Sequence, residues 1–86
     1  MKLALFGKKV DSTNIESLML FINKLSEYKH VELCYNVMFY NKLKQYTEDM
    51  PTGTFFTDGS DLPENTSLFL SLGGDGTFLE SLTLVQ

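Results

Sequence analysis

The sequence contains no arginine, and its seven basic residues are all lysines that lie at or before Lys44. From Gln45 to Gln86 it carries seven acidic residues and no cation, within a net charge of −4. A nucleic-acid-binding protein needs a basic stripe to meet the phosphate backbone, so this distribution excludes that class of partner. A phosphate bound by the C-terminal half would have to be neutralised by backbone N–H groups, a metal ion, a distant lysine or another polypeptide.

Cysteine and long apolar runs are also scarce. Cys34 is the single cysteine, which excludes an intrachain disulfide and fits a buried small residue in a reducing compartment. The first apolar run is only four residues long before Gly7, too short for a signal peptide. No segment approaches the roughly 20 apolar residues of a membrane span. We therefore expect a cytoplasmic protein with no membrane partner.

The apolar residues that are present predict alternating strands and helices. Runs with strand character span Leu3–Phe6, Val31–Val37 and Ser67–Leu72. Helical spacing of apolar residues covers Asn14–Tyr28, Phe39–Tyr46 and Thr77–Gln86. The pairs Thr13/Glu16 and Thr77/Glu80 have the spacing of a capping box, with Thr77 as the expected N-cap of the last helix.

Proline and glycine interrupt the pattern between Asp49 and Asn65, which predicts a long loop with a short strand or turn at Thr54–Thr57. The resulting order, β-α-β-α-β-α, predicts one α/β domain over residues 1–86: a three-layer, Rossmann-like fold with a small parallel sheet. Ligands of such sheets bind at the carboxyl ends of the strands. Lys8 and Lys9 follow the first strand there; they could lend charge to a phosphate, but a solvated turn is the favoured interpretation.

The most informative segment is "SLGGDGTFL", Ser71–Leu79. Consecutive glycines let the backbone turn and let a ligand approach, and free N–H groups beside a helix N-terminus favour an anion. Asp75 would repel a phosphate, so it fits better as a proton acceptor or a Mg²⁺ ligand, two roles that belong to phosphoryl transfer. A plain tight turn is the alternative. The segment matches neither the Walker A loop nor GxGxxG.

"LSLGGDGTFL" resembles the GGDGT signature of the NAD kinases, which make NADP with ATP or polyphosphate as donor. The resemblance extends loosely to "MKLALFGK" and to the strand–helix pattern that follows it. GGDGT also occurs in diacylglycerol and sphingosine kinases, and a close relative of it in phosphofructokinases. The lipid kinases usually continue differently, and "TFLESL" fits the NAD kinases better.

The resemblance implies that Asp75 is the base that activates the 2′-hydroxyl of the adenosine ribose of NAD. It implies that Gly76 and Leu79 lie close to NAD. The residues that match the turn meeting the donor phosphates are Gly73, Gly74, Gly76 and Thr77. ATP or polyphosphate and NAD are then the substrates, with a divalent metal, Mg²⁺, and no protein metal ligand identified. Glu80 departs from many members, which carry a basic residue there.

Family members are longer, and their β-rich C-terminal domain supplies an Asn-Glu or Asn-Asp motif that has no counterpart here. We therefore expect this chain to be the N-terminal nucleotide-binding domain of an NAD kinase, inactive alone, which associates with that missing C-terminal domain and forms a homo-oligomer. A domain of another GGDGT kinase, of the diacylglycerol or sphingosine kinase type, is one alternative. A non-enzymatic nucleotide-binding module is the other.

The remaining polar candidates have simpler interpretations. His30, the one histidine, is expected in a solvated connector between helix and strand. Asp58, Asp61 and Glu64 lie close together in the loop and have the chemistry of a metal site, but their glycine and proline neighbours favour a solvated turn.

Overall fold

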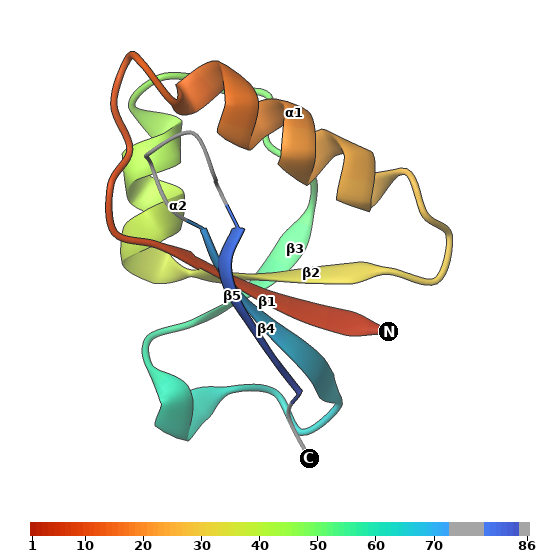
Figure 1. The fold of residues 1–86 in the computed structure, drawn as a ribbon. Helices are drawn as coiled ribbons and strands as arrows, with labels where there is room; N and C mark the ends of the chain where they lie inside the picture. Colours follow the sequence, from red (N-terminus) through yellow and green to blue (C-terminus); the bar gives the residue numbers. More distant parts are fainter. Residues whose placement is uncertain (73–78, 85–86) are drawn as a thin grey trace.

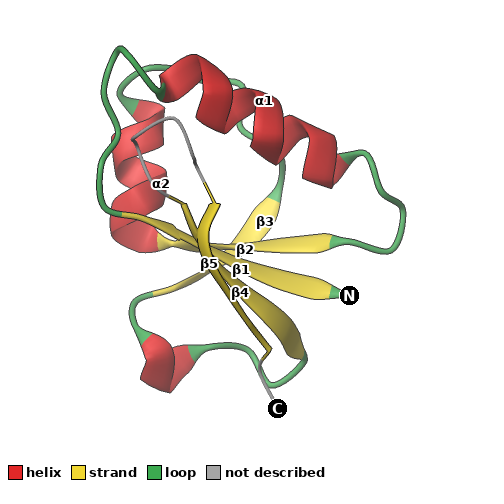
Figure 2. Cartoon of the chain, in the orientation of Figure 1, coloured by secondary structure: helices red, strands yellow, loops and turns green. Residues whose placement is uncertain are grey.

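Strands and helices alternate along most of the chain (Figures 1 and 2). The computed structural model describes residues 1–72 and 79–84. In chain order, the elements are β1 (Lys2–Gly7), α1 (Ile15–Ser26), β2 (Glu32–Asn36), α2 (Val37–Lys44), β3 (Gly53–Phe56), the 3₁₀ turn η1 (Gly59–Asp61), β4 (Thr66–Leu72) and β5 (Leu79–Leu84).

The strands form one sheet in the order β3-β2-β1-β4-β5. The first four strands are mutually parallel, and β5 runs antiparallel to β4. The predicted parallel α/β sheet is confirmed for β1 to β4, and the arrangement is compatible with the Rossmann-like class. The suspected short strand in the long loop is present as β3, one residue earlier than expected.

The predicted last helix is wrong, because Leu79–Leu84 forms β5. Leu68 pairs with Leu84 and Leu72 with Leu79, so β5 occupies an edge that β4 would otherwise expose. Asp75-Gly76 between two apolar runs is a strong hairpin signal, and a helix of ten residues gains little by itself. The order therefore ends in β-β rather than β-α. Thr77, the predicted N-cap, lies outside the described residues.

The two helices cover the same face of the sheet (Figure 1). Leu18 and Ile22 of α1, with Phe39 and Leu43 of α2, pack in one buried cluster against side chains of β1, β2 and β4. Two successive right-handed crossovers in the same direction place their helices on one face. The predicted three-layer fold requires helices on both faces of the sheet, and in the described residues both α-helices lie on one face. On the opposite face, the segment containing η1 contributes Leu62 to a smaller cluster.

The beginnings of both helices are set by asparagine and aspartate side chains. The N-cap of α1 is Asn14, without a side-chain capping bond, so the predicted capping box of Thr13 and Glu16 is wrong. The Thr13 hydroxyl instead donates to Asp11, whose carboxylate also accepts the backbone N–H of Thr13 and of Asn14. In α2, the side chain of Asn36 accepts the N–H of Phe39, which starts the helix earlier than the sequence predicts.

We expect Gly53→Ala to destabilise the domain by about 1–3 kcal/mol, because the site is already packed. A Cβ at Gly53 would lie 2.6 Å from the Leu33 carbonyl oxygen and 2.8 Å from the Tyr35 ring. The backbone carbonyl has little freedom to move, and the Tyr35 hydroxyl is held by the Pro51 carbonyl at 2.8 Å. Urea unfolding monitored by circular dichroism measures the loss, with Thr52→Ala at the exposed neighbouring position as the control. Equal stability of the two variants would contradict this packing.

Candidate functional site

The direction in which the chain adds strands to the sheet changes between β1 and β4. From β1 it proceeds to β2 and β3 on one side and then returns to β4 on the other. In an open parallel sheet such a switch point is where the loops diverge and ligands bind, at the carboxyl ends of the strands. Gly7 and Leu72, the last residues of β1 and β4, are paired with each other. The carboxyl ends of β1 and β4 therefore lie side by side.

The glycine-rich motif follows β4 in the sequence. Gly73 directly follows Leu72, the end of β4. The predicted site residues outside the described part of the chain are Gly73, Gly74, Asp75, Gly76 and Thr77. Leu79, the remaining one, opens β5, and its backbone pairs with Leu72. The sheet thus brings Leu72, which precedes the motif in the sequence, next to the end of β1.

The loop after β1 is held by its own polar side chains. Lys9 forms an ion pair with Asp11 at 3.7 Å, and the buried Asn14 amide donates to the Lys9 carbonyl at 2.8 Å. The hydrogen bond from the Thr13 hydroxyl is the main cause that lowers the pKa of Asp11. Lys8 is exposed and forms no ion pair within residues 1–72. Of the two lysines after β1, Lys8 is therefore the one whose charge no ion pair neutralises within residues 1–72.

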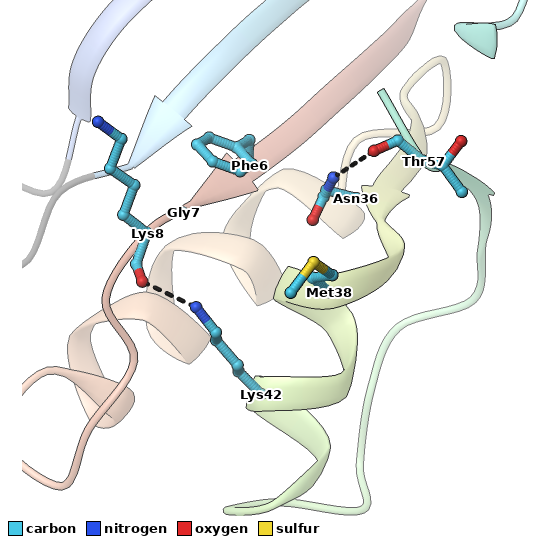
Figure 3. Close-up of a pocket in the computed structure, with 7 residues that line it drawn as sticks. All are labelled: Phe6, Gly7, Lys8, Asn36, Met38, Lys42 and Thr57. Carbon is cyan, nitrogen blue, oxygen red and sulfur yellow. Dashed lines mark hydrogen bonds between the residues drawn. The ribbon is translucent and has the colours of Figure 1, made fainter. Parts of the chain in front are cut away.

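A pocket of about 300 Å³ opens beside this switch point (Figure 3). It lies between the carboxyl ends of β1 and β2, the first turns of α2 and the residue after β3. Its lining residues are Phe6, Gly7, Lys8, Asn36, Met38, Lys42 and Thr57. Its lining includes two lysines and no acidic residue, although the chain as a whole is acidic; of these two, Lys8 turns its side chain toward the β4 side (Figure 3).

Asn36 connects two parts of the pocket wall, the start of α2 and the segment after β3. Its side chain is buried, with 6% exposure, at the junction of β2 and α2. Its Oδ1 accepts the Phe39 N–H at 2.9 Å, while its Nδ2 donates to the Thr57 carbonyl at 3.1 Å. The same amide therefore starts α2 and ties the segment after β3 to it.

Lys42 connects α2 to the loop after β1. Its Nζ donates to the Lys8 carbonyl at 2.9 Å, a contact visible in Figure 3. The Lys42 side chain is half-buried, whereas the Lys8 side chain extends away from Lys42 toward the β4 side (Figure 3). Lys42 thus occupies the α2 side of the pocket and Lys8 the side nearest the switch point.

The acidic side chains Asp58 and Asp61 of the long loop accept hydrogen bonds from within the same loop. Asp58 accepts the backbone N–H and the hydroxyl of Ser60, and Asp61 accepts the N–H groups of Thr57 and Asp58. These bonds form a capping box around η1. Across the residues that the structure describes, no group of three or more His, Cys, Asp or Glu side chains is placed to hold a metal ion. Asp58, Asp61 and Glu64 are all exposed, as the solvated-turn interpretation predicts, and the first two belong to the turn itself.

This capping box is expected to open in acid. The Asp58 N–H and the Thr57 hydroxyl and N–H lower the pKa of Asp61, and the Ser60 hydroxyl lowers that of Asp58. A lowered pKa in the folded state stabilises the loop above the usual value of 3.8 and ceases to do so as pH falls through the folded value. Amide hydrogen exchange at Thr57 and Asp58 should accelerate over that range relative to Ile22, and Asp61→Asn should remove most of the acid dependence. A loop unchanged in acid would contradict this assignment.

Sequence patterns predicted some of the residues at the carboxyl ends of the strands and missed others. His30 lies exposed between α1 and β2, as predicted, and its carbonyl accepts a hydrogen bond from the N-terminal amino group. Asn36, Met38, Lys42 and Thr57 were not predicted to line a pocket. The one available signal was the i, i+4 spacing of Met38 and Lys42, which puts both on the same face of α2.

Comparison of the chain with protein-family models, with curated proteins and with solved structures finds no match. Among residues 1–72 and 79–84, no helix has the length and apolar character needed to cross a membrane.

Proposed function

We propose that this chain is the N-terminal domain of an NAD kinase, which phosphorylates the 2′-hydroxyl of the adenosine ribose of NAD to give NADP. The observation that supports this most strongly is the place of GGDGT. In the sequence it directly follows Leu72, the last residue of β4, which is paired with Gly7 at the end of β1, at the switch point of a parallel sheet. A phosphate-handling motif at this position has the location that nucleotide sites of such sheets share.

In the proposed reaction, Asp75 accepts the proton of the 2′-hydroxyl as its oxygen attacks the terminal phosphorus of the donor. The bond from that phosphorus to the bridging oxygen breaks, and ADP or a shortened polyphosphate leaves with the electron pair. Gly73, Gly74, Gly76 and Thr77 meet the donor phosphates through backbone N–H groups and the threonine hydroxyl. Leu79 and Gly76 lie near NAD. Because Leu79–Leu84 is a strand, β5, and not a helix, a helix dipole in this segment does not contribute to phosphate binding in the proposal.

Magnesium is expected to arrive with the donor. Mg²⁺ is commonly bound by substrate phosphates with one or two carboxylates and several waters, rather than by a complete protein cage. When bound, the ion would neutralise charge on the donor phosphates.

The acidic character of the chain after Lys44 makes a further source of positive charge necessary. In our proposal the lysines near β1 supply one part, and the C-terminal domain of the full-length protein supplies the rest of the NAD pocket. The protein is then a cytoplasmic kinase in which this domain alone does not turn over.

The test is a panel of acceptors offered to the full-length protein with radiolabelled ATP and Mg²⁺. We expect phosphoryl transfer to NAD and none to diacylglycerol, sphingosine or fructose 6-phosphate. Transfer to a lipid or a sugar phosphate would replace the proposal with another GGDGT kinase. Binding of ATP without transfer to any acceptor would favour a non-enzymatic nucleotide-binding module.

A further inference from the structure

We infer that the pocket lined by Lys8 and Lys42 binds the phosphate chain of the phosphoryl donor, whether that chain belongs to a nucleoside triphosphate or to inorganic polyphosphate. The inference deepens the proposed function and rests on it for the identity of the ligand as a donor. It assigns a role to residues of β1, α2 and the segment after β3 that the GGDGT motif does not include.

The pocket lies where a donor chain can reach the reacting centre. Gly7 belongs to its lining and is also the residue paired with Leu72, immediately before the motif. Lys8 follows Gly7 and extends toward the β4 side (Figure 3). A phosphate chain that begins beside Lys42 and passes Lys8 therefore runs toward the carboxyl end of β4, where transfer is proposed.

Lys42 is positioned in advance for an anion. An ammonium group has three N–H donors, and the Lys8 carbonyl takes one of them at 2.9 Å. Two donors remain for phosphate oxygens, on a side chain that is already partly desolvated and held in place. Charge-assisted hydrogen bonds from such a group are about twice as strong as neutral ones.

The rest of the lining adds no negative charge. Phe6 and Met38 contribute apolar atoms to its walls. The first turn of α2 carries no acidic residue that would offset the positive end of its dipole. Asp61 is bonded to Thr57 but does not line the pocket, and its oxygens accept hydrogen bonds from the loop.

The dimensions select a phosphate chain over a whole nucleotide. A volume of about 300 Å³ is at the lower end of the range for small-molecule sites. Gly7 forms the floor of the pocket with its backbone. A side chain does not fit there, because a Cβ would lie 2.6 Å from the Phe39 ring. The nucleoside of ATP would then lie outside the pocket, and inorganic tripolyphosphate alone should bind.

The test is isothermal titration of the full-length protein with inorganic tripolyphosphate, with ATP and with orthophosphate. Lys42→Met and Lys8→Met should each raise the Kd for tripolyphosphate and for ATP by about tenfold or more. Lys42→Arg, which keeps the charge, should stay close to the wild type. Lys44→Met is the matched control, because Lys44 lies on the same helix over the Tyr40 ring and outside the pocket. Circular dichroism of each variant confirms that it is folded.

Tripolyphosphate binding that is the same in Lys42→Met and Lys44→Met would overturn the inference, and so would a protein that binds ATP but no tripolyphosphate. Equal loss of ATP and tripolyphosphate affinity supports a phosphate-chain site. The proposed function fails separately: if NAD is not phosphorylated but tripolyphosphate binding still depends on Lys42, the pocket stands and the kinase does not. If NADP forms with an unchanged donor KM in Lys42→Met, the proposed kinase activity is supported and the inference that the pocket binds the donor is refuted.

Discussion

Replacing Asp75 with asparagine in the full-length protein is expected to lower kcat for NAD phosphorylation by about 10²–10⁴-fold, the usual contribution of a general base. The amide keeps the size of the carboxylate but cannot accept the proton of the 2′-hydroxyl. The KM for NAD should change much less, because the proton is taken in the transition state rather than on binding. Steady-state kinetics of NADP formation measure both quantities.

Asp49→Asn is the matched control, since Asp49 is an exposed aspartate in the loop after α2. The same isosteric change there should leave kcat unaltered. A variant at Asp75 that turns over within about threefold of the wild type would contradict the role of base, because the expected range begins far above that value.

Phe39→Ala is expected to cost about 3–5 kcal/mol of the free energy of unfolding. The Phe39 side chain is fully buried, at 0% exposure, and its ring lies directly against Gly7 at the end of β1. Removal of the ring leaves a cavity between α2 and the sheet under the pocket floor. For a domain of 86 residues that loss is a large part of the total stability.

Urea unfolding of Phe39→Ala beside Met38→Ala tests this packing. Met38 is the preceding residue on the same helix but is 69% exposed, so its truncation should change stability by about 0.5 kcal/mol or less. Because the loss at Phe39 can unfold the domain entirely, Phe39→Leu serves as a milder variant with an intermediate loss. Similar stabilities for the variants at 38 and 39 would show that α2 does not pack on the sheet as described.

Local patterns predicted most elements because their signals are local. The apolar runs of β1 and β4 and the helical spacing of α1 lie within short segments, and all three elements appear within about two residues of their predicted bounds. The start of α2 was missed because Asn36 can end a strand or cap a helix, and only its bond to the Phe39 N–H decides between them.

The last element was missed for a different reason. The segment after the motif has both a capping-box spacing and the composition to pair with an edge strand, and the free edge of β4 becomes visible only when the sheet is assembled. Strand order is likewise a tertiary property. No local pattern in the sequence places Gly7 beside Leu72 or brings Lys42 to the Lys8 carbonyl, so the switch point and the pocket required the structure.

The measurement that tests the central claim most directly is the identity of the product made by the full-length protein from NAD, ATP and Mg²⁺. The account predicts NADP, detected by reduction with an NADP-specific dehydrogenase, with phosphorus NMR placing the new phosphate on the 2′-oxygen of the adenosine ribose. Absence of phosphorylated NAD, or a phosphate on any other hydroxyl, would contradict it.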